Sequence, residues 1–174
     1  MRAPMSAVFL LAFTVATSAG QSANSPFSID ISGPKTVKAG APIEIKAVLT
    51  NTSDHSLDFK AHEPGEFNYS TEVFKSDGQR EDYTTHGYLM ATGKCDPKYG
   101  GTTNRAISCA GQYSQPQLVT LRSGGKYLTL IVVTEQFHLR QPGDYLIRVS
   151  RSTAGEPRNQ VLVMSNTMTV TVTP

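Results

Sequence analysis

Apolar and polar residues alternate most regularly near the end of the chain. Residues 165–173 end in threonines that alternate with apolar side chains, and residues 142–150 form an alternating stretch that begins with a Pro-Gly turn. Successive side chains of a β-strand point to opposite faces, so this alternation predicts strands with one buried face and one face in water. Because the two stretches are close in the sequence, we expect them to pair antiparallel and to close a β-sandwich.

The same period of two recurs earlier in the chain. It predicts further strands, each bounded by turn-forming residues, over residues 27–32, 43–50, 57–61, 117–121 and 127–133. Helical periodicity is absent from the sequence after residue 20, apart from a single helical turn expected within residues 136–141. The pattern therefore predicts an all-β protein, an antiparallel β-sandwich of about seven short strands that forms one domain over residues 21–174.

The middle of the chain is less regular. Asp77-Gly78 separates residues 72–75 from residues 80–83 and is typical of a hairpin, because glycine adopts a positive φ at little cost. Residues 84–117 are rich in Gly, Thr, Ser and Asn, which predicts a long loop insertion with one short strand near residues 88–90.

The first twenty residues resemble a secretory signal. Arg2 precedes an apolar run at residues 7–15, which is too short to span a bilayer, and small residues follow at 16–20. We expect cleavage after Ala19 or Gly20 and a secreted or periplasmic protein; the alternative is an N-terminal core strand or helix. No later run reaches the length of a membrane helix. The net charge is only +2, so composition gives no case for nucleic acid or an anionic membrane as a partner.

The chain has two cysteines, Cys95 and Cys109, and both lie in the irregular insertion. In an oxidising compartment such a pair usually forms a disulfide, and closing a loop of about 15 residues contributes about 3 kcal/mol. The alternative is two free thiols. A zinc site would need two more ligands at suitable spacing, which the sequence does not show.

Tyr145 follows Pro142-Gly143-Asp144 at the start of a predicted strand. This arrangement resembles a tyrosine corner, in which the hydroxyl bonds to backbone a few residues upstream; the alternative is an ordinary core tyrosine. The layout resembles immunoglobulin-like sandwiches. It departs from true immunoglobulin domains because it has no Trp and because Ile147 stands where their second core Cys would be. The resemblance is thus to the sandwiches that lack the core disulfide.

The order of elements also resembles that of bacterial proteinase-inhibitor-like domains of the intracellular subtilisin-inhibitor type, and of β-sandwich regions beside some secreted metallopeptidases. The turns and strand ends that carry this resemblance are residues 49–59, 72–78, 121–125 and 141–145. The resemblance implies protease inhibition. Export and the Cys95–Cys109 insertion depart from an intracellular inhibitor.

Motifs of catalysis are missing from the sequence. The histidines form no His-Glu-x-x-His pair, and Gly-x-Ser-x-Gly and a phosphate-binding loop are absent. A metal site that combines a histidine with Asp58, Glu63 or Asp82 is geometrically possible, but polar neighbours suggest solvated histidines. Asn51 and Asn68 match the glycosylation pattern, which chance also explains. We therefore expect no enzyme activity, no cofactor and no bound metal.

Aromatic and basic side chains concentrate in the irregular half, and such side chains dominate recognition surfaces. The candidate binding residues are Tyr88, Lys94, Lys98, Tyr99, Arg105 and Tyr113, with Tyr69 and Tyr83 in the wider set. The alternative is that several of them cover an open edge of the sandwich. The sequence favours an exported, non-catalytic domain that binds a protein or cell-envelope component through its loops. The alternatives are an extracellular protease inhibitor and, less favoured, a hydrolase or metal enzyme.

Overall fold

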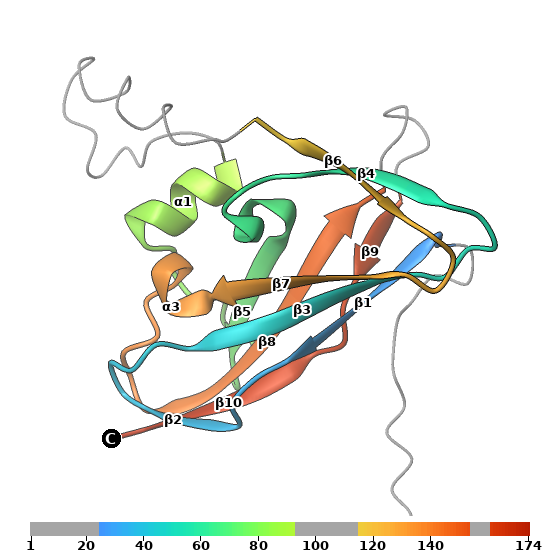
Figure 1. Ribbon diagram of the computed structural model, residues 1–174. Coiled ribbons are helices and arrows are strands. Elements are labelled where there is room, and N and C mark those ends of the chain that lie inside the picture. The colour runs from blue at the N-terminus through green and yellow to red at the C-terminus, as the bar shows by residue number, and fades with distance from the viewer. Residues whose placement is uncertain (1–24, 93–114, 154–160) are drawn as a thin grey trace, which may run out of the picture.

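Two facing sheets form the body of the protein in a computed structural model, which describes residues 25–92, 115–153 and 161–174 (Figure 1). The first sheet has the strand order β1-β3-β7, with β1 at Phe27–Ser32, β3 at Glu44–Asn51 and β7 at Lys126–Val132. Each neighbouring pair is antiparallel, and Leu49 of β3 lies opposite Ile29 of β1 and Tyr127 of β7. This is the largely alternating, half-buried sheet that the sequence predicts.

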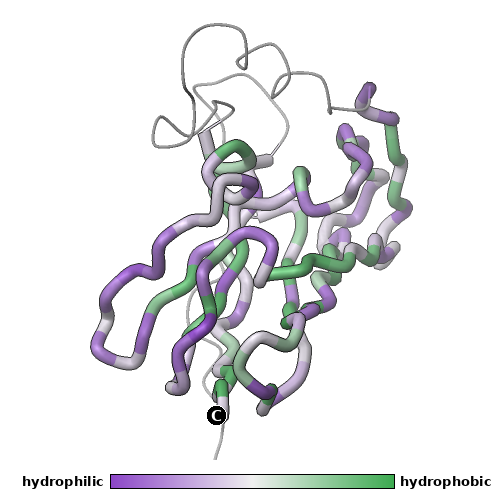
Figure 2. Tube along the Cα trace, turned by 90° about the vertical axis from the view of Figure 1, so that its left-hand side faces the viewer, coloured by the Kyte–Doolittle hydropathy of each residue, from purple (hydrophilic) through white to green (hydrophobic). Residues whose placement is uncertain are grey.

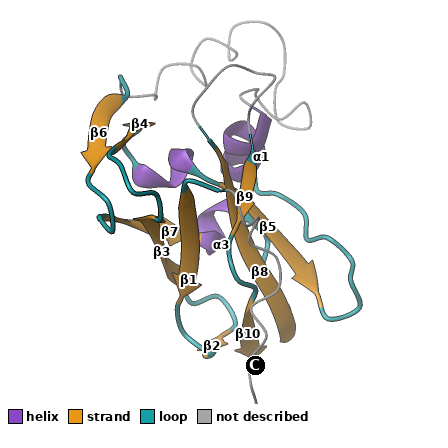
Figure 3. Ribbon diagram, turned by 90° about the vertical axis from the view of Figure 1, so that its right-hand side faces the viewer, coloured by secondary structure: helices purple, strands orange, loops and turns teal. Residues whose placement is uncertain are grey.

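The second sheet faces the first across the core (Figure 3). Its order is β2-β10-β8-β5, with β9 also paired to β8, and the bounds are Thr36–Lys38 (β2), Met168–Thr173 (β10), Gly143–Ser152 (β8), Ser70–Lys75 (β5) and Leu162–Met164 (β9). The predicted closing pair is confirmed, because β8 and β10 are antiparallel neighbours. In immunoglobulin terms β1-β3-β7 correspond to strands A, B and E, and β5-β8-β10 correspond to C, F and G.

The remaining elements gather at one end of the sandwich. Strands β4 (Leu57–Ala61) and β6 (Gln117–Leu121) form a small antiparallel sheet. Beside it lie the 3-10 helix η1 (Gly65–Asn68) and the short helices α1 (Thr85–Thr92) and α3 (Val133–Gln136). No helix in the described part of the chain is both long enough and apolar enough to cross a membrane.

The core lies between the two sheets and uses the inward positions of each strand. Side chains with no solvent exposure include Ile29, Ile45, Leu49 and Ile131 from the first sheet and Val73, Ile147, Val149 and Val170 from the second. Buried and less buried positions alternate along β1, β3 and β10, and Figure 2 shows hydrophobic and hydrophilic positions interleaved along the trace. Burying such aliphatic side chains stabilises the fold by about 1.5–3 kcal/mol each.

Two side chains fix loops to the strands of the sandwich by hydrogen bonds. The amide of Asn166, between β9 and β10, accepts a hydrogen bond from the backbone N–H of Ile31 at 2.7 Å and donates one to its carbonyl oxygen at 3.1 Å. It therefore pairs with edge strand β1 as a neighbouring strand would. Tyr145 is buried, and its hydroxyl donates to the carbonyl oxygen of Gln141 at 2.8 Å, which is the bond of a tyrosine corner.

The structure corrects several expectations about strands. The sheets are not wholly antiparallel, because β2 runs parallel to β10. The described residues contain ten strands rather than about seven, and β2 and β9 have only three residues each. The second arm of the hairpin around Asp77-Gly78 is reduced to isolated bridges, such as Phe74 opposite Arg80. Strands this short give no periodic signal.

The helices also differ from the prediction. Residues 88–90, expected to be a strand, lie in helix α1. The hydroxyl of Thr84 accepts a hydrogen bond from the N–H of Gly87 at 3.0 Å and so caps the first turn of the helix. α3 comes before the helical turn expected at residues 136–141.

Both glycosylation-pattern asparagines serve the fold instead. Asn51 is 1% exposed, and its amide nitrogen donates to the carbonyl oxygens of His55 and Leu121 at 2.8 and 2.9 Å. Asn68 is also buried, and its amide nitrogen donates to the carbonyl oxygens of His62 and Gly65. Neither amide is accessible for modification in the folded domain.

Candidate functional site

Helix α1 is fixed to α3 by direct backbone contact. A Cβ atom at Gly87 would lie 1.9 Å from the carbonyl oxygen of Gln136, so only glycine fits at this position. The backbone N–H of Thr84 donates to that same oxygen at 2.9 Å, and the ring of Tyr83 lies 4.8 Å from that of Phe137. These contacts hold α1 beside α3 at one end of the sandwich (Figure 1).

A cavity of about 270 Å³ lies beneath α1, and we call it the α1 cavity. Its apolar lining comes from Phe67, Tyr83, Met90, Ala91 and Leu162, which lie on η1, α1, β9 and the segment before α1. Its polar lining comes mainly from the strands and includes Tyr69, Thr71, Ser150, Arg151 and Gln136. The cavity therefore combines an apolar side with a polar side.

Four residues that line the α1 cavity carry buried polar atoms without a hydrogen-bond partner. These atoms are the hydroxyls of Tyr69 and Thr71, Nε2 of Gln136 and Nη1 of Arg151. Tyr69, Thr71 and Gln136 are themselves only 7%, 4% and 4% exposed. A buried polar group that lacks a partner costs about 1–3 kcal/mol, and four of these groups belong to residues around this one cavity.

Arg151 is a half-buried cation on this wall. Its Nη2 donates to the carbonyl oxygen of Lys60 at 2.7 Å, and its guanidinium lies 4.6 Å from the ring centre of Phe59 and 5.8 Å from that of Tyr69. Aromatic faces stabilise a cation only in part. Within the described residues no carboxylate forms an ion pair with Arg151. Burial lowers the pKa of its guanidinium below the usual value.

Arg148, three residues earlier on β8, shows the ordinary arrangement. Its Nε donates to a carboxylate oxygen of Glu72 at 2.7 Å, and its guanidinium lies 5.0 Å from the ring centre of Phe74. Both arginines therefore lie over an aromatic ring, but among residues 25–92, 115–153 and 161–174 only Arg148 has a carboxylate partner. The comparison shows that Arg151 is unusual in lacking a carboxylate partner and not in lying over an aromatic ring.

Tyr69 lies beside this cation and has a perturbed hydroxyl. Burial raises the pKa of Tyr69 above its ordinary value of 10.0, and hydrogen-bonding contacts with Thr129 and Arg151, together with the charge of Arg151, oppose that rise. The Tyr69 and Thr129 hydroxyls both lack a hydrogen bond of standard geometry. The interior at this end is thus polar but incompletely paired.

A second cavity, of about 530 Å³, lies beneath β4 and β6. Its apolar lining comes from Phe27, Leu49, Leu57, Phe59 and Leu118, and Arg151 and Ser152 line it together with the α1 cavity. Leu118, Val161 and Leu162 are exposed at this same end. Arg151 therefore lies between the α1 cavity, which has both polar and apolar walls, and a larger cavity with a mainly apolar lining.

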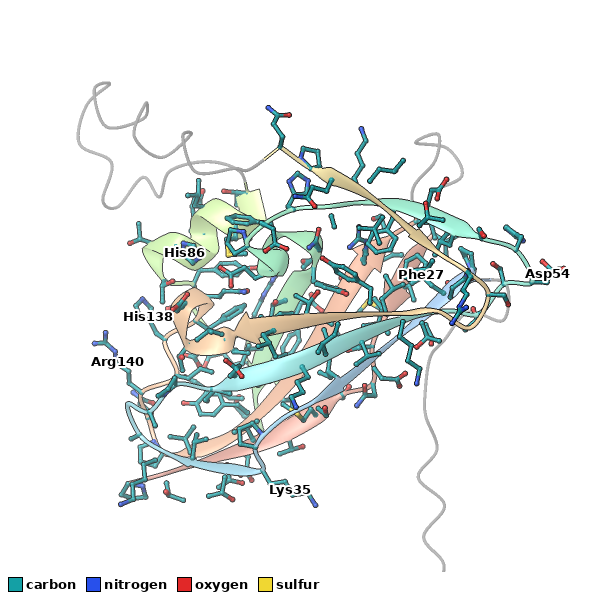
Figure 4. The ribbon with its side chains drawn as sticks, viewed as in Figure 1. Phe27, Lys35, Asp54, His86, His138 and Arg140 are labelled. Carbon is teal, nitrogen blue, oxygen red and sulfur yellow. The ribbon has the colours of Figure 1, made fainter. Side chains whose placement is uncertain are left out.

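A group of metal-type side chains lies on η1, α1 and α3. Nε2 of His86 is 3.2 Å from a carboxylate oxygen of the buried Glu66, and Glu135 brings its own ligand atom within 4.8 Å of both. This set could offer one nitrogen and two oxygens to a divalent cation. It differs from the carboxylates considered from sequence, Asp58, Glu63 and Asp82. Figure 4 places His86 at this end and Asp54 at the far turn after β3.

The structure describes only some of the residues suggested by the sequence. Tyr88 lies half-buried on α1 but does not line the α1 cavity. Outside the described residues lie the other suggested residues, Lys94, Cys95, Lys98, Tyr99, Arg105, Cys109 and Tyr113, together with the predicted signal segment and the predicted disulfide. From the wider tyrosine set, the fold brings Tyr69 and Tyr83 to the α1 cavity.

Sequence reasoning missed Arg151, although the sequence contains a signal for it. Tyr145, Ile147 and Val149 occupy alternate, buried positions of β8, and Arg151 is the next position in that series. An arginine at an inward position of a strand is an exception to the pattern. Arg148 falls in the opposite, outward series.

No protein-family model matches the chain, and no curated protein matches it either. Among solved structures, the chain is similar to the crystal structure of the CARDB domain of a protein from Pyrococcus furiosus, solved in complex with di-metal ions. The likeness covers 92% of this chain and 100% of that chain, with 12% identity and a TM-score of 0.41. Similarity this low carries no argument about ligands. The description as an immunoglobulin-like sandwich rests on the strand order above, and no comparison bears on the resemblance to proteinase inhibitors.

Proposed function

We propose that this protein is an exported, non-catalytic binding domain whose ligand enters the α1 cavity. The sandwich supplies a rigid base, and the short helices and connections at its α1 end supply the site, which is where such folds usually bind. The observation that carries the proposal is the set of buried polar atoms without partners on residues that line the α1 cavity. Arg151 supplies the positive charge that this site offers to a ligand.

The test uses the full chain expressed in its own host and purified under native conditions. Denaturation followed by mass spectrometry of the released small molecules should show a ligand in a fixed ratio to the protein. Ala91→Phe places a large ring at an exposed cavity-lining position of α1 and should remove that ligand. Thr85→Phe changes an exposed residue of the same helix away from the cavity and should retain it.

Two results would contradict the proposal. One is a wild-type protein that releases no small molecule and gains no thermal stability from an extract of its native envelope. The other is a ligand that Ala91→Phe retains as fully as wild type.

A further inference from the structure

We propose that the α1 cavity recognises an organic carboxylate, with Arg151 as its counter-ion. This inference rests on the proposed function and names the class of ligand. The guanidinium of Arg151 has one nitrogen bonded to the Lys60 carbonyl oxygen, while Nη1 is buried without a partner. A half-buried cation without a carboxylate partner is unfavourable, and its natural complement is a planar carboxylate that can accept two parallel hydrogen bonds.

The buried polar groups that lack a hydrogen bond of standard geometry agree with a negatively charged ligand. Nη1 of Arg151 and Nε2 of Gln136 can only donate, and the hydroxyls of Tyr69 and Thr71 can also donate. A carboxylate offers two acceptor oxygens to such a set. A ligand ammonium group would leave both nitrogen donors unpaired and would face the like charge of Arg151.

The other cavity walls indicate what the carboxylate is attached to. Met90, Ala91 and Leu162 face the same space and suit a short apolar body rather than a sugar. A space of about 270 Å³ holds a small acid or the end of a longer chain. The same chemistry would come from a free aliphatic acid or from the C-terminal carboxylate of a peptide with an apolar last residue.

Probes of similar shape but different charge distinguish the effect of ligand charge on binding from the effect of ligand shape. Isothermal titration calorimetry with the full chain would compare sodium hexanoate with hexanamide and hexylammonium chloride, and Gly-Gly-Leu with its C-terminal amide. We expect both carboxylates to bind at least about thirtyfold more tightly than their amides, because losing one partner of a desolvated charge pair is costly. The tighter of the two carboxylates identifies the source. Sodium sulfate binding as tightly as hexanoate would contradict a carboxylate site.

Arginine variants locate the site. Arg151→Met should weaken hexanoate binding by at least about thirtyfold. Arg151→Lys should weaken it less, because lysine keeps the positive charge but lacks the two parallel donors of the guanidinium. Arg148→Met is the matched control, since Arg148 lies on the same strand and over a ring but already pairs with Glu72, and it should bind hexanoate as wild type does. A thermal melt of each variant confirms that it is folded, and Arg151→Lys serves if Arg151→Met does not fold.

The failures can be told apart. If hexanoate and hexanamide bind alike, or if both Arg151 variants bind hexanoate as wild type does, the carboxylate assignment is wrong. The proposed function survives that result as long as Ala91→Phe releases the native ligand. If native protein holds no ligand that Ala91→Phe removes, the proposed function itself fails.

Discussion

Gly87 of α1 touches the backbone of Gln136 in α3 so closely that a Cβ at position 87 would lie 1.9 Å from the Gln136 carbonyl oxygen. No flexible side chain can move to relieve this contact, because the neighbour is backbone. This backbone contact therefore fixes the position of α1 relative to the sheets. It also fixes Gln136, whose Nε2 is one of the unpartnered atoms beside the α1 cavity.

Gly87→Ala should detach α1 from α3. We expect the free energy of unfolding to fall by about 1–3 kcal/mol, as for an overpacked interior, and hexanoate binding to weaken with it. Urea unfolding measures the first effect and calorimetry the second. Thr85→Ala, on the exposed side of the same helix, should stay within about 0.5 kcal/mol of wild type. A Gly87→Ala protein as stable as that control would mean that α1 does not pack as described.

Tyr145→Phe should remove the bond that holds the corner before β8. The Tyr145 hydroxyl donates to the Gln141 carbonyl oxygen at 2.8 Å, and such a bond contributes about 0.5–1.5 kcal/mol. The midpoint of urea unfolding should shift down accordingly. Tyr127→Phe, which removes a hydroxyl from the first sheet, is the comparison and should change the midpoint less. Equal shifts of the unfolding midpoint in the two variants would contradict a stabilising role for the tyrosine corner.

The buried hydroxyl of Tyr69 should make the free energy of unfolding decrease at alkaline pH. Burial raises the pKa of Tyr69 in the folded state above its ordinary value of 10.0, so the unfolded chain releases this proton first. Above pH 10 the unfolded state binds fewer protons, and the free energy of unfolding falls as pH rises. Below that pH the contribution is fully present.

Tyr69→Phe tests this linkage. Its unfolding free energy should fall less steeply than that of wild type above pH 10. Some slope should remain, because burial also raises the pKa values of Tyr127 and Tyr145. Near pH 7 the variant should be as stable as wild type or slightly more so, since the lost hydroxyl has no hydrogen bond of standard geometry. Identical pH profiles from pH 8 to 11.5 would contradict the buried position of this hydroxyl.

Export predicts a defined N-terminus. Mass spectrometry of the mature protein from its host should give the mass of a chain that begins at Gln21 or at Gly20. Replacing Val8 and Leu11 in the apolar run with Asp should keep the precursor inside the cell. A full-length chain recovered from the medium or periplasm would contradict cleavage of this segment.

The strands were predictable because alternation reports burial directly. Strands β1, β4 and β6 have the bounds that the pattern of apolar residues predicts, and β8 pairs with β10 as expected. Helix α1 was not predictable, since eight residues with no apolar stripe give no period and a backbone contact at Gly87 holds them. The pairing of Asn166 with Ile31 joins residues 135 positions apart, which a local pattern cannot show. Among these missed features, only Arg151 could have been recognised in the sequence, because it is a charged residue in the inward-facing series of β8.

The side-chain NMR signal of Arg151 tests the central claim most directly. The Nε–Hε resonances of Arg151 and Arg148 would be assigned by substitution and followed in one sample as sodium hexanoate is added. The Arg151 resonance should shift and saturate with the binding curve while that of Arg148 stays in place, and hexanamide should move neither. An Arg151 resonance that does not respond to hexanoate, or that moves only in step with Arg148, would contradict a carboxylate site in the α1 cavity.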